Sequence, residues 1–126
     1  MMRGGIVSEH EHAKAFVRVV GLYQQQRPEL ALLFAVPNGG DRNKIVAGKM
    51  KAEGVKAGVP DYIFPVAHGG FHGLAIELKS ATGKASREQV RWIESLRDQG
   101  WRAEVCRGWG EAMRVLADYC GFEFRA

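Results

Sequence analysis

The chain has 126 residues, 46% of them hydrophobic, and its 18 Lys and Arg outnumber 14 Asp and Glu for a formal net charge of +4. This size and composition suit a single globular domain, residues 1–126 with a core over about 8–120. No apolar run approaches the roughly 20 residues needed to cross a bilayer, which excludes a membrane-spanning helix.

The charge and the cysteine content indicate the surroundings of the chain. A basic chain favours an anionic partner, although positive charge alone does not prove one. Residues 1–11 lack the apolar stretch of a secretory signal, so we expect a cytoplasmic protein. Cys106 and Cys120 lie in apolar-patterned segments, and we expect reduced, buried thiols, with a disulfide as the alternative.

The first part of the chain predicts two helices with a strand between them. Residues 8–27 form an amphipathic pattern that starts at a capping serine and ends before a proline. Residues 30–36 form a short apolar run that predicts a strand, and residues 37–40 form a turn. Residues 43–53 predict a second helix ended by a glycine. The side chains of the first helix expected in the core are Ala13, Phe16, Val17, Val20 and Tyr23.

The second part predicts two paired strands and then a helix, a strand and a helix. Residues 61–66 and 74–80 are the predicted strands, and a glycine-rich turn joins them. A Ser-Arg-Glu-Gln capping box at residues 86–89 begins the next helix. Residues 101–107 alternate in polarity as a strand does, and residues 111–119 predict a closing helix. This order predicts an α/β domain with a central mixed β-sheet flanked by helices.

Three charged residues on the two central strands form a candidate site. In a strand, residues i and i+2 share a face, so Glu77 and Lys79 point one way and the residues between them point into the core. If the strands pair as a hairpin, Asp61 comes close to Glu77. Two such carboxylates repel each other unless a cation lies between them, and Mg²⁺ prefers carboxylate and water oxygens. The three residues therefore suit metal-dependent hydrolysis of a phosphodiester.

Simpler roles exist for each of these residues. Asp61 follows a proline and can be a turn residue, while Glu77 and Lys79 can form a weak ion pair on a solvated strand face. Hydrophobic neighbours indicate a central strand, however, where charges are costly without a purpose. The three residues together therefore favour the catalytic interpretation.

The charged residues belong to an ordered set of sequence blocks. The blocks are Val-Pro-Asn-Gly-Gly at 36–40, Gly-Val-Pro-Asp at 58–61, Gly-Leu-Ala-Ile-Glu-Leu-Lys at 73–79, Ser-Arg-Glu-Gln at 86–89 and Ala-Glu-Val-Cys at 103–106. A bare Pro-Asp with Glu-X-Lys occurs by chance, but the ordered set is specific. From about residue 8 to 119 the chain resembles the PD-(D/E)XK nuclease superfamily and, more narrowly, its VRR-NUC family.

The resemblance implies a restriction-endonuclease-like fold around a Mg²⁺ or Mn²⁺ centre. By that resemblance, Asp61, Glu77 and the backbone carbonyl of Leu78 would bind the metal. Lys79 would position the attacking water or stabilise charge on the scissile phosphate.

An acid from the first helix completes the site in this family. Glu9 is our choice because it follows the capping serine, and Glu11 is the rival; stabilisation of the helix dipole is the simpler role for Glu9. The family carries a glutamine four residues after that acid, where this chain has Ala13. Gln89 corresponds to the family's glutamine after the lysine strand, with helix capping as its first role and a site contact as its second.

Further polar residues are candidates for contact with nucleic acid. Each has a simpler interpretation as a turn residue, a solvated helix face or a surface histidine, and zinc binding is disfavoured because the histidines have no cysteine nearby. The candidates are Asn38, Lys44, Lys49, Lys51, His68 and His72.

The resemblance implies a structure-selective DNA endonuclease that works as a homodimer on branched DNA such as four-way junctions. Small nucleases of this type occur in bacteria and phage, so the expected location is the cytoplasm of a bacterial or phage-infected cell. The alternatives are a nickase or exonuclease without branch preference, and a non-catalytic nucleic-acid-binding module on a nuclease fold. The intact Asp61, Glu77 and Lys79 disfavour the last of these.

Overall fold

The structure is a computed structural model that describes residues 7–37 and 44–125. The predicted order of helices and strands is confirmed, with one short 3₁₀ helix added. The helices are α1 (Glu9–Gln24), η1 (Pro28–Leu32), α2 (Lys44–Ala52), α3 (Arg87–Asp98) and α4 (Trp109–Cys120), and the strands are β1 (Phe34–Ala35), β2 (Tyr62–Phe64), β3 (Leu74–Lys79) and β4 (Arg102–Arg107).

The four strands form one mixed sheet in the order β1-β2-β3-β4. β1 pairs with β2, and β2 with β3, in antiparallel register, whereas β3 and β4 are parallel. A parallel pair needs a crossover connection, and α3 supplies it. The predicted central mixed sheet flanked by helices is therefore confirmed.

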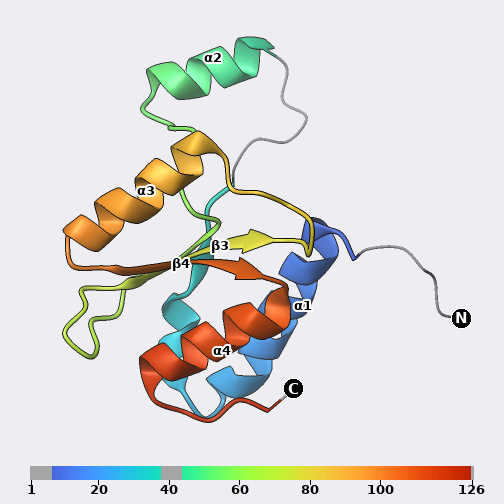
Figure 1. The fold of residues 1–126 in the computed structure, drawn as a ribbon, viewed down its shortest axis with the longest axis vertical. Coiled ribbons are helices and arrows are strands. Elements are labelled where there is room, and N and C mark those ends of the chain that lie inside the picture. The colour runs from blue at the N-terminus through green and yellow to red at the C-terminus, as the bar shows by residue number, and fades with distance from the viewer. Residues whose placement is uncertain (1–6, 38–43, 126) are drawn as a thin grey trace, which may run out of the picture.

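Helices cover both faces of the sheet (Figure 1). One hydrophobic cluster joins α1 and α4 to the side chains of Leu74, Ile76 and Leu78. A second, smaller cluster joins Ile93 of α3 to Ala75 on the opposite face of β3. All six residues of β3 are buried, so any charge that this strand carries lies inside the protein.

Two helices start where the sequence predicted, because their first turns contain their own hydrogen-bond acceptors. Ser8 begins α1 and Ser86 begins α3, and each forms a full capping box with the residue three positions later. A capping side chain satisfies backbone N–H groups that have no partner within the helix and stabilises it by about 1 kcal/mol. The positions of both helix starts matter for the site described below.

The predicted strand over residues 30–36 is wrong in most of its length. The apolar run begins as η1, with Pro28 presetting the backbone of its first turn, and only Phe34–Ala35 pairs as a strand. A short apolar run does not distinguish a buried helical turn from a strand, and here Leu30 is buried in the helical form.

One predicted core residue of α1 is also misplaced. Phe16 and Val20 are buried and Ala13 and Tyr23 pack against the core, but Val17 is 53% exposed. Val17 instead lines an open groove between α1 and β1.

Cys106 and Cys120 are free and buried, as predicted. Burial raises the pKa of Cys106 to about 12 and that of Cys120 to about 11, so both remain thiols at neutral pH. Within the described part of the chain, no helix is long and apolar enough to cross a membrane.

Candidate active site

The register of the sheet brings Asp61 next to Glu77. Tyr62 of β2 faces Ile76 of β3, so one step outward along the antiparallel pair places Asp61 opposite Glu77. Asp61 Oδ2 accepts a hydrogen bond of 2.8 Å from the backbone N–H of Leu78. The backbone carbonyl of Asp61 accepts another of 2.8 Å from Val36, which fixes the start of β2 against β1.

Glu77 and Lys79 are buried charges on the same face of β3, as the spacing predicted. Glu77 is 1% exposed and Lys79 is 7% exposed. Glu77 Oε2 lies 3.1 Å from Lys79 Nζ and accepts a hydrogen bond of 2.9 Å from Gln89 Nε2. Glu77 Oε1 is also buried but has no hydrogen-bonding partner among the described residues. A carboxylate oxygen without a partner at this depth is unfavourable, so Glu77 either takes up a proton and hydrogen-bonds to Asp61 or has its charge balanced by a cation.

The surroundings of Glu77 favour its neutral form in the absence of a bound cation. Burial is the largest cause, and the negative charge of Asp61 is the next; Lys79 acts in the opposite direction. Together they raise the pKa of Glu77 to about 7. A cation beside the two carboxylates would reverse this effect, because it stabilises their charged forms.

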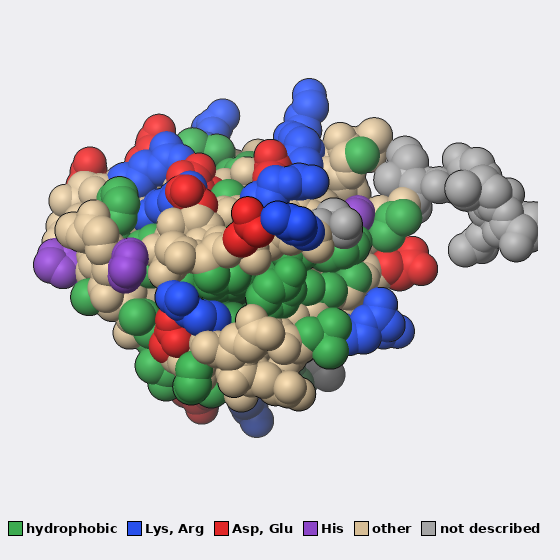
Figure 2. All heavy atoms as spheres, turned by 90° about the horizontal axis from the view of Figure 1, so that it is seen from below, with side chains coloured by type: hydrophobic (Ala, Val, Ile, Leu, Met, Phe, Trp, Pro, Cys, Tyr) green, Lys and Arg blue, Asp and Glu red, His purple; other side chains and the backbone are tan. Residues whose placement is uncertain are grey.

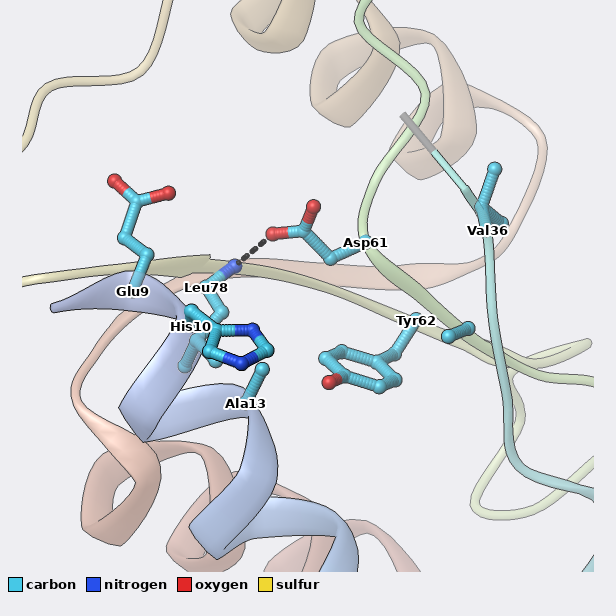
Figure 3. A pocket seen from close by; sticks show the side chains of 8 residues that line it. Glu9, His10, Ala13, Val36, Asp61, Tyr62 and Leu78 are labelled. Atoms are coloured by element: carbon cyan, nitrogen blue, oxygen red, sulfur yellow. Dashed lines mark hydrogen bonds between the residues drawn. The ribbon is translucent and has the colours of Figure 1, made fainter. Parts of the chain in front are cut away.

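A pocket of about 360 Å³ opens beside Asp61 at this end of the sheet. Figure 3 shows Glu9 and Asp61 on either side of the end of β3, with both carboxylates on the same side of the strand and the ring of His10 below them. The pocket is lined by Glu9, His10, Ala13, Ala35, Val36, Asp61, Tyr62 and Leu78.

The structure separates the two acids at the start of α1. Glu11 completes the capping box, where its Oε1 accepts a hydrogen bond of 3.2 Å from the N–H of Ser8. Glu9 lines the pocket. Its Oε2 lies close to Gly83: a Cβ atom added to Gly83 would be 3.0 Å from this oxygen. Of the two candidates, Glu9 is therefore the one that reaches the site, while its role there remains a proposal.

His10 is a pocket residue that the sequence analysis did not select. The sequence feature that could have indicated it is its position beside Glu9 and one helical turn before Ala13. All three residues line the same pocket. From the sequence, His10 is predicted to be a surface histidine, since it has no cysteine nearby that would indicate zinc binding.

Gln89 combines both of the roles considered for it. Its Oε1 accepts a hydrogen bond of 2.8 Å from the N–H of Ser86, which completes the capping box of α3. Its Nε2 donates to Glu77 Oε2 at the same time. The helix start thereby fixes the direction of the Glu77 carboxylate.

The segment after β3 is held by the neighbouring strand. Arg107 Nη1 of β4 donates to the backbone carbonyls of Ser80, at 3.2 Å, and of Gly83. The N–H of Gly108 donates to the carbonyl of Lys79 at 2.9 Å. These bonds fix the backbone around Lys79 and the loop that faces Glu9.

The other candidates for nucleic-acid contact do not join this pocket. Lys44, Lys49 and Lys51 are exposed on α2. His68 and His72 lie in the turn between β2 and β3, at the opposite end of the sheet from Asp61. His68 packs near Tyr119 there, with ring centroids 6.0 Å apart. Asn38 lies outside the described residues.

The donor set of the site fits a hard divalent ion that keeps several waters. Within residues 7–37 and 44–125, no three His, Cys, Asp or Glu residues lie close enough to hold a metal by themselves. Mg²⁺ commonly uses one or two carboxylates together with waters and substrate phosphates. Asp61 and the unpartnered Oε1 of Glu77 match that requirement, with Glu9 at the far side of the pocket.

The sheet and its helices, with Asp61 beside the buried Glu77–Lys79 pair, form an α/β fold of the nuclease type. The family model for the VRR-NUC domain matches residues 6–109, and the chain belongs to that family. The chain is also similar to a solved VRR_NUC domain protein, with 30% identity, a TM-score of 0.77, and coverage of 93% of this chain and 91% of that one. Among curated proteins, none matches the sequence. Membership places the chain among nucleases and connects it with DNA.

Proposed function

We propose that the protein is a metal-dependent DNA endonuclease that uses Mg²⁺ or Mn²⁺ and acts on branched DNA such as four-way junctions. The observation that carries the proposal is the carboxylate of Glu77, buried beside Asp61 and Lys79 with one oxygen unpartnered. The branch preference rests on the family resemblance and is the part that the substrate comparison below tests.

Asp61, Glu77 and the backbone carbonyl of Leu78 would hold the ion, and Glu9 would complete the site from α1. The chemistry that a divalent ion supplies when bound is a lowered pKa of water and neutralised charge on phosphate oxygens. Asp61 is positioned for this by its bond from Leu78, and Glu77 by its bond from Gln89.

Lys79 contributes a fixed positive charge that needs no rearrangement during the reaction. Its ammonium group is buried beside Glu77, and its backbone is fixed by Gly108. Such a preorganised charge stabilises the extra negative charge that develops on the scissile phosphate. In this proposal, Lys79 and Glu77 of β3 supply the positive charge and the metal-binding carboxylate that phosphodiester hydrolysis needs, and Asp61 supplies the second carboxylate.

We also propose that the protein is a homodimer, since two sites would cut both strands of a junction. The support is an apolar groove of about 320 Å³ between α1 and the edge strand β1, where Val17 is 53% and Phe34 is 51% exposed. An exposed edge strand with apolar side chains is a surface that proteins normally cover. Sedimentation of the wild type and Phe34→Glu tests this: a monomeric wild type contradicts it.

The activity is tested by cleavage of end-labelled four-way junction, flap and linear duplex DNA with Mg²⁺, Mn²⁺ or EDTA. Lys79→Ala is the matched inactive variant, and the corresponding RNA duplex checks the choice of nucleic acid. Metal-dependent cutting of DNA that needs Lys79 and is strongest on the junction supports the whole proposal. Equal cutting of all three DNAs retains the nuclease and removes the branch preference. Junction binding without any cutting contradicts catalysis.

A further inference from the structure

Helix α2 is basic, and every one of its residues except the half-buried Met50 is exposed. It contains three lysines and no acidic residue, and none of its residues is buried. Lys44 and Lys51 lie seven residues apart and so share a face, with Gly48 between them. In the part of the chain that the structure describes, the ion pairs involve none of these lysines. The positive charge of α2 is therefore available to a partner.

The segment that follows α2 packs against α3 and leads to the active site. Trp92 Nε1 of α3 donates to the backbone carbonyl of Ala57 at 3.1 Å. Gly58 has a φ of +87° and packs so closely on Glu88 that a Cβ there would lie 2.6 Å from the Glu88 Cβ. Glu88 precedes Gln89, which holds Glu77, and the same segment runs on into Asp61.

α2 projects away from the sheet beyond this attachment (Figure 1). Nine residues at a rise of about 1.5 Å per residue give a helix of roughly 13 Å. A DNA duplex carries one phosphate charge per about 1.7 Å of its axis, so the helix can follow about four base pairs. A duplex that lay along α2 would therefore bring several phosphates within reach of its lysines.

The side of the molecule away from α2 has a different charge pattern. Figure 2 shows acidic and basic side chains standing beside each other there, with a band of hydrophobic side chains across the middle. Ion pairs within the chain include Arg27 with Glu29 and Arg102 with Asp118. Such paired charges attract a polyanion far less than the unpaired lysines of α2 do.

From the charge, exposure and attachment of α2 we infer that this helix binds the phosphate backbone of the DNA duplex that flanks the cleaved bond. The inference rests on the proposed nuclease function and adds a second contact region outside the pocket. The role of α2 is affinity for flanking duplex, so the reaction itself does not depend on it.

The test compares two variants that remove equal charge from different places. Lys44→Gln/Lys51→Gln changes α2, and Arg18→Gln/Arg114→Gln changes exposed positions of α1 and α4. Binding to a junction with long arms is measured in EDTA over a series of salt concentrations. The α2 variant is expected to lower the slope of log affinity against log salt by about 1.8, or 0.9 for each lost phosphate contact. The control variant should leave the slope near that of the wild type.

Arm length and turnover give an independent readout. With arms trimmed to a few base pairs, the wild type and the α2 variant should bind equally, because the flanking phosphates are gone. At saturating DNA with Mg²⁺, the α2 variant should retain the wild-type kcat with a raised KM.

Three results would overturn the inference. If the slope of log affinity against log salt is unchanged in the α2 variant while the wild type binds and cleaves DNA, α2 does not bind the flanking duplex and the proposed nuclease function is retained. An equal loss in the control variant shows a general charge effect. Absence of DNA binding by the wild type rejects both this inference and the proposed function.

Discussion

The end of β3 and helix α2 both present charged residues, but the two regions treat charge in opposite ways. At the end of β3, Glu77 and Lys79 are almost fully buried and bonded to each other, and Gln89 is bonded to Glu77. On α2, every lysine is exposed and none is used in an ion pair of the described residues. The charges at the end of β3 are held in fixed positions inside the protein, whereas those of α2 are exposed to solvent.

The difference separates chemistry from affinity. Charges removed from water interact strongly and destabilise the free protein, which suits groups that must act on one phosphate. Exposed charges interact weakly one by one, but they add along a polyanion. Substitutions at the end of β3 should therefore change turnover and stability, while substitutions on α2 should change binding.

The largest effect is expected from Lys79→Ala. Loss of a preorganised charge beside the reacting phosphate should lower kcat by about 10²–10³-fold or more. The fold should persist, because Glu77 Oε2 keeps its bond from Gln89 and Glu77 can become neutral. Cleavage rates and far-ultraviolet circular dichroism check the two statements. Full activity in a folded variant would remove Lys79 from the site.

The second prediction concerns stability without metal. The pKa of Glu77 is raised from 4.5 to about 7, so the folded state binds its proton more tightly than the unfolded state does. The free energy of unfolding should therefore fall as pH rises from about 4.5 to 7, by up to about 3 kcal/mol from this group, and then level off. Denaturant unfolding in EDTA across this range measures the fall.

Glu77→Gln is the control for that experiment, because it removes the titrating group with little change in shape. Its unfolding free energy should depend less on pH between 4.5 and 7. Added Mg²⁺ at pH 8 should raise the Tm of the wild type but not of this variant, since a bound ion stabilises only the folded state. Identical pH profiles for the two proteins would contradict the assignment.

A third, smaller effect distinguishes the two acids of α1. Glu9→Gln should lower cleavage by about 10–100-fold, the range seen when a group supporting a metal site is lost. Glu11→Gln should leave both kcat and stability near the wild-type values, because a glutamine at this position also closes a capping box, as Gln89 does in α3. Parallel cleavage and thermal unfolding measurements test the pair. Reversed results would make Glu11 the site acid.

The smallest effect is expected at the attachment of α2. Trp92→Phe keeps most of the ring but loses the hydrogen bond to Ala57, worth about 1 kcal/mol. Amide hydrogen exchange in α2 should become faster, while exchange in β3 stays unchanged. Unchanged exchange in α2 would show that the packing of Gly58 on Glu88 is sufficient to hold this segment.

The sequence predicted the parts of the fold that local chemistry controls. Capping serines, stopping glycines and alternating strands act within a few residues, so α1, α3, β3 and β4 lie where they were predicted. The prediction of a strand over residues 30–36 was wrong because η1 and β1 share one apolar pattern, and only packing decides between a helical turn and a strand. The prediction that Val17 is buried was wrong for a similar reason, since the exposure of a helix face depends on what packs beside it.

For the site, the sequence by itself determined the chemistry of the residues, and the spacing of Glu77 and Lys79 determined their shared face. Only the tertiary structure decided which distant groups meet them. The antiparallel register places Asp61 beside Glu77, the start of α3 brings Gln89 to the same carboxylate, and α1 turns Glu9 and His10 toward the pocket. These contacts join residues 12 or more positions apart, over which local patterns carry no information, and the packing of α1 and α3 on the two faces of the sheet sets them.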